Sequence, residues 1–162
     1  MAAKRGKTAP KDAAGVKIVA RNKEASRRWE VLETYEAGLV LTGTEVKALR
    51  EGNVQISDAY AIVKDGGAYL LNLHIGPYKA AGPHLQHEPT RTRKLLLHRR
   101  ELERLLGKVQ QKGLSLVPLD VHFRRGWAKV TLGLCRGKHK QDRREDLKRR
   151  QADREMARYL KR

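Results

Sequence analysis

The chain has 162 residues, of which 36 are Lys or Arg and 18 are Asp or Glu, so its formal net charge at pH 7 is +18. This length suits one compact domain with extensions, and the charge favours an RNA or DNA partner, with an anionic membrane surface as the second choice. The lone cysteine, Cys135, excludes an intramolecular disulfide or a cysteine-based zinc site and fits a reducing cytoplasm.

The chain opens with a loose basic leader, residues 1–15, which lacks the apolar core of a signal peptide. No apolar run further along reaches the length of a membrane span. Alternating apolar residues predict a short strand over 16–20 and a second over 29–35, and we expect Gly38 to end the second before a third begins. Between the first two strands, Asn22 either opens a turn or caps a single turn of helix.

A capping box marks the first clear helix, in the sequence Thr42-Gly43-Thr44-Glu45. Thr42 is the expected N-cap, Glu45 is its reciprocal partner, and Gly52 suits the position just beyond the helix end. A helix of about two turns is too short to stand alone, so we expect it to be held between strands.

The middle of the chain predicts a β-hairpin and then a long loop. The β-rich runs 58–63 and 69–75 flank Asp65-Gly66-Gly67, a strong hairpin signal. A proline-containing loop follows, over 76–90, and loops of this length are usually functional or mobile. A further β-rich run covers 91–97.

The last part of the domain predicts a helix and a second hairpin. A helix is expected over 98–112 because four apolar residues recur at helical spacing: Leu102, Leu105, Leu106 and Val109. Gly113 stops this helix, and the strands 114–123 and 127–135 follow, joined by Arg124-Arg125-Gly126. Six or seven short strands with small helices between them indicate a mainly β protein, a closed or partly closed antiparallel barrel over 16–135.

The tail, residues 136–162, has twelve Lys or Arg against five acidic residues. It is too polar to form a core that would offset an ordering entropy of about 1–2 kcal/mol per residue. Yet it has no Gly or Pro after Gly137, and Arg150, Arg154 and Arg158 would stack on one helical face. We predict a tail that is disordered when free and helical against a polyanion; the alternative is a solvated basic terminus with no assigned task.

Catalytic and metal-binding motifs are not apparent. The sequence contains no glycine-rich phosphate loop, nucleophile elbow or zinc-protease motif. His84 and His87 could hold a metal at i, i+3, but no carboxylate or thiol lies at ligand spacing, so ordinary loop histidines are the better interpretation. We therefore predict a protein that is not an enzyme and has no cofactor.

Basic residues at strand ends and turns are the stronger signal: Lys23, Arg27, Arg28, Arg91, Arg93, Lys94, Arg124, Arg125 and Lys129. Lys and Arg in such positions can contact phosphates, and nearby aromatic side chains can stack on bases. The aromatic candidates are Trp29, Tyr35, Tyr78 and Trp127, although core packing is the expected role for most of them.

Several segments, in order, resemble the SsrA-binding proteins (small protein B), the partners of transfer-messenger RNA in bacterial ribosome rescue. The resemblance runs from about Lys17 to the end of the chain. It rests on these segments: 22–25 (Asn-Lys-Glu-Ala), 36–52 with Gly-Thr-Glu-Val-Lys-Ala-Leu-Arg-Glu-Gly at its end, 56–60, 89–97, and 129 onward into Gly137-Lys138.

The resemblance implies an OB-like barrel with short helices that binds the tRNA-like part of transfer-messenger RNA. By motif position it assigns this binding to Glu36, Leu96 and Lys129. Lys129 can contact phosphate, Glu36 can accept from a base amino group or a 2′-OH or orient a basic neighbour, and Leu96 shapes the surface by packing. Further RNA contacts are expected in the matching segments from Asn22, Lys23, Arg91, Arg93 and Lys94.

For the tail, the resemblance implies entry into the vacant mRNA channel of a stalled ribosome, near the decoding centre, where the tail becomes helical. The residues concerned are Gly137, Lys138, His139, Lys140, Asp142, Arg143, Arg144, Arg150, Arg154 and Arg158. Two departures from the family pattern are the Gly-Lys-His step in place of Gly-Lys-Lys and a tail without the tryptophan that many relatives carry.

The partners implied are transfer-messenger RNA, the small ribosomal subunit and, through the RNA complex, elongation factor Tu and alanyl-tRNA synthetase. We expect a cytoplasmic monomer that does not bind membranes. The competing hypothesis is a general rRNA-binding or ribosome-associated protein with a basic tail, and an enzyme such as a metal-dependent nuclease ranks last.

Overall fold

The computed structural model describes residues 15–111, 113–138 and 140–160, and of these it leaves out the side chains of 140–143 and 159. The predicted leader thus lies outside the described residues except for Gly15. In chain order, the described α-helices and strands are β1 (Val16–Arg21), α1 (Ala25–Arg28), β2 (Trp29–Leu39), α2 (Gly43–Arg50), β3 (Val54–Gln55), β4 (Tyr60–Lys64), β5 (Gly67–Leu71), β6 (His74–Ile75), β7 (Arg93–Leu96), α3 (Arg99–Val109), β8 (Leu114–Arg124), β9 (Trp127–Gly137) and α4 (Lys140–Tyr159). Two short 3-10 helices, Lys79–Ala81 and Pro83–Leu85, lie between β6 and β7.

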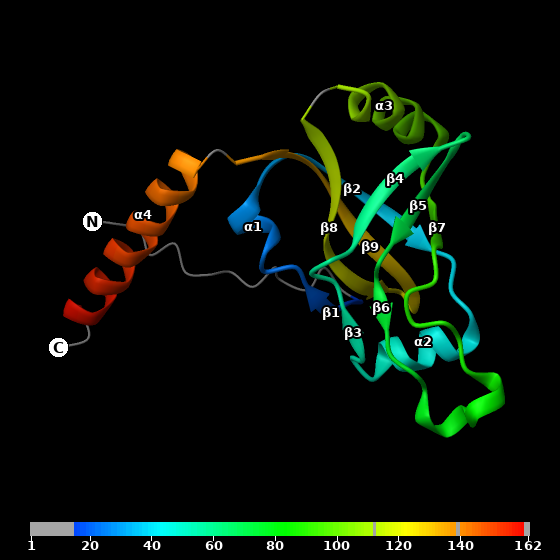
Figure 1. The fold of residues 1–162 in the computed structure, drawn as a ribbon. Coiled ribbons are helices and arrows are strands. Elements are labelled where there is room, and N and C mark those ends of the chain that lie inside the picture. The colour runs from blue at the N-terminus through cyan, green and yellow to red at the C-terminus, as the bar shows by residue number, and fades with distance from the viewer. Residues whose placement is uncertain (1–14, 112, 139, 161–162) are drawn as a thin grey trace.

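An antiparallel sheet dominates the fold and closes on itself (Figure 1). Its strand order is β1-β8-β4-β5-β7-β2-β9, and β9 pairs with β8 as well as with β2. The strands from β8 round to β9 therefore form a closed ring, to which β1 is added along β8. The prediction of a mainly β antiparallel barrel with short helices is confirmed. Strands β3 and β6 form a separate small sheet.

Two tight turns set the register of the barrel strands. Asp65 and Gly66, between β4 and β5, have φ angles of 50° and 71°, and Arg125 and Gly126, between β8 and β9, have 50° and 79°. Positive φ at both central residues matches the right-handed twist of the flanking strands. Both hairpins predicted from the sequence are confirmed.

Strand β2 is longer than predicted, because it continues through Gly38 to Leu39. The predicted strand end at Gly38 is therefore wrong. Gly38 pairs with Leu96 of β7 on one side and with Lys129 of β9 on the other. A Cβ atom on Gly38 would lie 3.3 Å from the Leu96 Cβ, so the glycine permits a close approach of side chain to backbone.

The core fills the barrel and extends under the two helices α2 and α3, which lie at opposite ends of it in Figure 1. Leu49 of α2 and Leu105 of α3 are completely buried among barrel residues such as Leu70 and Leu132. Each buried leucine contributes about 1.5–3 kcal/mol. The predicted capping box is confirmed, with the backbone N–H of Thr42 donating to Glu45 Oε2 over 2.8 Å.

The long loop between β6 and β7 is fastened by side chains rather than by sheet pairing. Gln86 Nε2 donates to the backbone oxygen of Tyr78 over 2.6 Å, and Gln86 Oε1 accepts from the Tyr78 N–H over 3.0 Å. The two ring nitrogens of His87 lie 2.9 Å from Thr44 Oγ1 and from the backbone oxygen of Ile75. His87 thus connects the loop to α2 and β6.

Helix α4 leaves the barrel after β9 and projects away from it (Figure 1). Near its start, Lys138 Nζ donates to the backbone oxygen of Ser26 over 2.9 Å and pairs with Asp146. The described part of the tail forms α4, and the change from a disordered free tail to a helix on a polyanion stays a prediction. Among the described residues, none of the helices combines the length and apolar composition needed to cross a membrane.

Candidate nucleic-acid interface

A groove on the outside of the barrel, which we call the β2–β9 groove, collects three of the predicted site residues. It has a volume of about 660 Å³. Glu36, Leu96 and Lys129 all line it, although they come from three different strands. The register explains this, because Gly38 of β2 faces both Leu96 and Lys129. The full lining is Glu36, Gly38, Leu39, Val40, Leu41, Leu96, Leu97, His98, Trp127, Ala128 and Lys129.

The Glu36 carboxylate is the electrostatic centre of this groove. Lys129 Nζ donates to Oε1 over 3.0 Å, while Arg124 Nη2 and His122 Nε2 lie 3.1 Å and 3.2 Å from Oε2. Burial alone would raise the pKa of Glu36, but the hydrogen bonds from Lys129 and His122 and the charge of Arg124 outweigh it and lower that pKa. Glu36 is therefore an ionised acceptor held among basic groups.

Behind Glu36 lies a network of polar side chains that was not predicted from the sequence. His122 Nδ1 lies 2.7 Å from Asp120 Oδ1, which also accepts a hydrogen bond from Thr131 Oγ1 over 3.0 Å. Asp120 and His122 are two residues apart on β8, so strand alternation places them on one face. That alternation was the signal that could have found them.

Large apolar side chains are exposed to solvent at the rim of the groove. Trp127 is 75% exposed and Leu96 is 55% exposed, and Val40 is also an exposed large apolar residue. Core packing was the expectation for most aromatic side chains, but Trp127 lies outside the core. Its position at the start of β9, just after the hairpin turn, leaves the indole faces accessible for stacking.

Strand β7 places the predicted RNA-contact residues Arg93 and Lys94 on opposite faces of the sheet, because side chains alternate along a strand. Its burial pattern puts Arg93 and Leu95 inward and Lys94 and Leu96 outward. Lys94 thus shares the outer face with Leu96 and is exposed, as an RNA contact requires. Arg93 does not share that face.

Arg93 is buried beside Glu45, and the side chains of both are 0% exposed. Their closest nitrogen–oxygen distance is 2.9 Å, and Arg91 Nη2 lies 2.7 Å from the other oxygen of Glu45. Burial would raise the pKa of Glu45, but the hydrogen bonds from Arg91 and the Thr42 N–H, with the charge of Arg93, lower it to about 2. We therefore revise the predicted role of Arg93 from RNA contact to stabilisation of the fold. Arg91, whose guanidinium pairs with the same carboxylate, belongs to this buried cluster as well.

Asn22 is likewise a structural residue, whereas its neighbour Lys23 is exposed. Asn22 Nδ2 donates to the backbone oxygen of Pro118 over 3.0 Å, and Asn22 Oδ1 accepts from the N–H of Ala25 over 3.1 Å. The second of these bonds closes the turn that precedes α1, whose N-cap residue is Glu24, so of the two predicted alternatives the structure has the turn. Both polar atoms of Asn22 are thus engaged within the protein.

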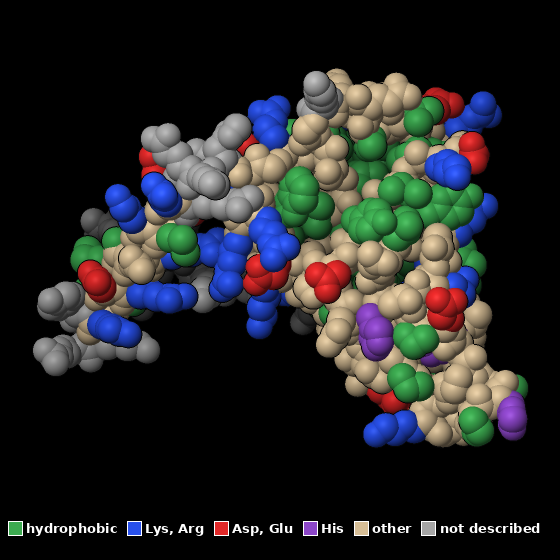
Figure 2. Space-filling model, in the orientation of Figure 1, with side chains coloured by type: hydrophobic (Ala, Val, Ile, Leu, Met, Phe, Trp, Pro, Cys, Tyr) green, Lys and Arg blue, Asp and Glu red, His purple; other side chains and the backbone are tan. Residues whose placement is uncertain are grey.

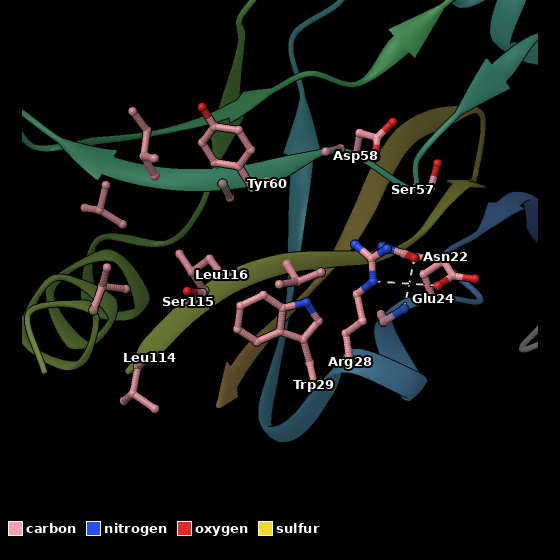
Figure 3. A pocket seen from close by; sticks show the side chains of 17 residues that line it. Asn22, Glu24, Arg28, Trp29, Ser57, Asp58, Tyr60, Leu114, Ser115 and Leu116 are labelled. Carbon is pink, nitrogen blue, oxygen red and sulfur yellow. Dashed lines mark hydrogen bonds and ion pairs between the residues drawn. The ribbon is translucent and has the colours of Figure 1, made fainter. Parts of the chain in front are cut away.

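A second groove, of about 620 Å³, runs beside Asn22 between α1, β4 and β8. In Figure 3, Trp29 and Arg28 lie along one side of it and Tyr60 lies across from them. Its charged lining is mixed, with Glu24 and Asp58 as well as Arg28. It therefore lacks the concentration of basic groups found around Glu36.

The tail residues are basic and mostly exposed where the structure describes them. Arg144, Arg154 and Arg158 are exposed on α4 and Arg150 is half-buried, and Figure 2 shows Lys and Arg side chains gathered where α4 approaches α1. Gly137 ends β9, and Lys138 is tied to Ser26 and Asp146. His139 lies outside the described residues, as do the side chains of three other predicted tail residues: Lys140, Asp142 and Arg143.

These features define a class of protein: a small, basic, antiparallel β-barrel with a groove of mixed polar and aromatic character and a basic C-terminal helix. Comparison with known families narrows it further. The family described as SmpB protein matches residues 19–162, so the chain belongs to the SmpB family.

Individual relatives agree with this assignment. An SsrA-binding protein of Nostoc punctiforme is 54% identical over 147 residues, covering 91% of this chain and 95% of that protein. One from Gloeothece citriformis is 53% identical, covering 90% and 94%. A chain in a solved structure described as "tmRNA-SmpB: a journey to the center of the bacterial ribosome" has a TM-score of 0.64 and 51% identity, and the match covers 83% of this chain and 95% of that one.

Proposed function

We propose that this protein binds the tRNA-like part of transfer-messenger RNA and delivers it to stalled ribosomes for trans-translation. The observation that carries the proposal is the β2–β9 groove, which brings Glu36, Leu96 and Lys129 together from three strands. Membership of the SmpB family supports it, as do relatives named SsrA-binding proteins and a structural neighbour described as tmRNA-SmpB.

Each group in the groove has a chemical role toward a folded RNA. Lys129 contacts phosphate, and Lys94 on the same outer face and Lys23 beside α1 extend the basic surface. Glu36 accepts a hydrogen bond from a base amino group or a 2′-OH, which is the group that distinguishes RNA from DNA. Trp127 stacks on an unpaired base, with Leu96 as an exposed apolar contact at the same rim.

The tail has a separate role in the proposal. Exposed arginines on α4 suit an RNA-walled channel, and we assign the tail to the empty mRNA channel near the decoding centre. We expect this tail to be disordered in the free protein, because the large apolar side chains Leu147 and Met156 of α4 are exposed, and amide exchange over residues 143–159 should show little protection there. Strong protection of those amides would contradict this part of the proposal.

The assembly that follows is a cytoplasmic one. The protein acts as a monomer, and elongation factor Tu and alanyl-tRNA synthetase join through the RNA rather than through direct contacts with the barrel. Its task is recognition and delivery, with no chemical step of its own.

A binding comparison tests the proposal against a general rRNA-binding role. The affinity for transfer-messenger RNA and for bulk tRNA is measured by gel shift at two salt concentrations, because phosphate contacts alone weaken steeply with salt. We expect tighter binding to transfer-messenger RNA at both concentrations. Equal affinity for the two RNAs would favour the general rRNA-binding protein.

A further inference from the structure

His122 lies between two carboxylates and is almost completely shielded from solvent. Its side chain is 4% exposed, with Nδ1 at 2.7 Å from Asp120 Oδ1 and Nε2 at 3.2 Å from Glu36 Oε2. Both ring nitrogens therefore face hydrogen-bond acceptors. One of those acceptors, Glu36, lines the β2–β9 groove.

The two protonation states of the ring differ in what they can do here. A neutral imidazole has one N–H and one lone pair, whereas the imidazolium ion has two N–H groups. A neutral His122 would satisfy one carboxylate and turn its lone pair toward the other. Because the ring is buried, water cannot compensate for that contact. The imidazolium form satisfies both carboxylates at once.

Other side chains also contact the two carboxylates, Glu36 and Asp120. Lys129 Nζ and Arg124 Nη2 also contact Glu36, and Thr131 Oγ1 donates to Asp120. Lys129 is the residue opposite His122 on β9. On the other side, β1 places Ile18 opposite His122 and the exposed Arg21 opposite Asp120. Lysine and arginine side chains ordinarily stay charged near neutral pH, so among the basic groups that contact Glu36 or Asp120 the imidazole of His122 is the one whose charge can change.

We propose that His122 is a pH-responsive positioning residue, whose imidazolium form bridges Asp120 and Glu36, holds the Glu36 carboxylate in place in the groove, and thereby strengthens RNA binding. The inference rests on the proposed function of the groove. When pH rises and the ring loses its proton, Glu36 loses one donor and draws Lys129 and Arg124 toward itself. The groove then offers less positive charge to phosphate, so RNA affinity falls as pH rises.

Two variants separate this role from simple packing. In His122→Gln, the side chain can donate to one carboxylate but cannot change its charge. In Asp120→Asn, the new amide donates to Nδ1, so a neutral ring can still donate from Nε2 to Glu36. His84→Gln is the matched control, since His84 is an exposed histidine in the loop before β7, outside the groove.

The experiment measures affinity for the tRNA-like part of transfer-messenger RNA at about pH 6, 7 and 8, on both sides of ordinary imidazole titration, at fixed ionic strength. We expect the wild-type protein and His84→Gln to weaken by about tenfold from the lowest to the highest pH, the effect of one charge-assisted hydrogen bond. His122→Gln and Asp120→Asn should change by less than about twofold, and Asp120→Asn should keep near wild-type affinity at the lowest pH. Equal pH dependence in wild type and His122→Gln would overturn the proposal.

A measurement without RNA distinguishes failure of this inference from failure of the proposed function. Nitrogen-15 shifts of the His122 ring in the free full-length protein should show both nitrogens protonated at the pH at which RNA binds most tightly. A neutral ring at that pH would refute the bridge whatever the RNA does. If Glu36→Ala and Lys129→Ala leave RNA affinity unchanged at every pH, the proposed RNA site fails, while the ring shifts still decide the bridge. Circular dichroism checks folding, and Asp120→Asn decides the matter if His122→Gln does not fold.

Discussion

Glu45 and Glu36 are two carboxylates with similar partners in opposite settings. Glu45 is 0% exposed and is paired with Arg91 and Arg93, at 2.7 Å and 2.9 Å. The Glu36 side chain is 29% exposed, faces a groove, and is paired with Lys129 and Arg124, at 3.0 Å and 3.1 Å. Both are ionised acceptors that join elements far apart in the sequence, helix α2 with the segment into β7 for Glu45 and strands β2, β8 and β9 for Glu36.

The difference between them is burial, and burial decides what each cluster can do. Removing Arg93 would leave the buried Glu45 carboxylate with the partly exposed Arg91 as its remaining described ion-pair partner, a loss of about 3–5 kcal/mol. Glu36 can exchange a protein partner for an RNA group or water, because exposed ion pairs contribute only about 0–1 kcal/mol. The Glu45 cluster is therefore suited to stability and the Glu36 cluster to binding.

The largest expected effect is on stability, from breaking the buried cluster. Arg93→Met should lower the free energy of unfolding by about 3–5 kcal/mol, because Glu45 loses its buried partner. Urea denaturation measures the loss. Arg99→Met is the matched control, since Arg99 pairs with Glu103 on the exposed face of α3 and should cost less than about 0.5 kcal/mol. Equal losses in the two variants would mean that burial does not separate the clusters.

Acid should weaken the same cluster in the wild-type protein. The pKa of Glu45 is lowered from 4.5 to about 2, because the hydrogen bonds from Arg91 and Thr42 and the charge of Arg93 outweigh its burial. A lowered pKa stabilises the fold fully above pH 4.5, and that contribution is lost as pH falls from 4.5 toward 2. The loss should be about 3 kcal/mol in total.

Urea denaturation across this pH range measures the effect. Glu45→Gln should be less stable than wild type at pH 6, and the gap between the two proteins should narrow as the medium becomes acidic. A constant gap would show that Glu45 does not titrate with the fold.

Breaking the half-buried Glu36 cluster should affect binding and leave the fold intact. Glu36→Ala and Lys129→Ala should each weaken binding to transfer-messenger RNA by about tenfold or more, as expected for loss of a hydrogen bond involving a charged group. Their free energies of unfolding should fall by less than about 1 kcal/mol. Lys64→Ala, which removes an exposed lysine of β4 outside the groove, should change neither quantity much. A circular dichroism spectrum of an unfolded chain in either groove variant would make that residue structural.

Trp127→Ala tests the groove rim alone. Because it is 75% exposed, Trp127→Ala should leave the unfolding midpoint nearly unchanged. Loss of one base-stacking partner should weaken RNA binding by about 1–3 kcal/mol. Trp127→Phe keeps an aromatic face and should recover part of the affinity, measured by the same gel shift. No recovery with Phe would indicate that the indole N–H, and not stacking, makes the contact.

Local sequence signals predicted much of this fold. The turn sequences Asp65-Gly66 and Arg125-Gly126 and the Thr42–Glu45 capping box each require little beyond neighbouring residues, and all are present in the structure. The strand end predicted at Gly38 was wrong because a glycine in a strand can mark either the end of the strand or a point where a neighbouring side chain comes close to the backbone. Only the pairing of β2 with both β7 and β9 decides between these.

The division between the two clusters could not be predicted from the sequence. Arg93 lies in a basic run whose composition suggests a surface, and its inward position is tolerated only because Glu45, 48 residues earlier, supplies the opposite charge. Likewise, the link from His122 to Glu36 spans 86 residues. Local patterns place a side chain on one face of a strand, whereas the closed barrel decides which distant partner it meets.

The tail should have the smallest effect on the groove and a large effect elsewhere. Deleting residues 140–162 should change affinity for transfer-messenger RNA by no more than about twofold at moderate salt, because α4 projects away from the barrel and contributes no described residue to the lining of the groove. Tagging on stalled ribosomes should nevertheless be lost.

A matched pair of variants within α4 separates its shape from its charge. Gln151→Pro keeps every charge but costs about 3 kcal/mol in a helix interior, whereas Gln151→Ala favours the helix. If the tail works as a helix inside the ribosome, Gln151→Pro should lose tagging and Gln151→Ala should keep it, with equal RNA affinity in both. Normal tagging by Gln151→Pro would mean that the charge of the tail suffices. The barrel would then be the one part of the protein whose function depends on a defined shape.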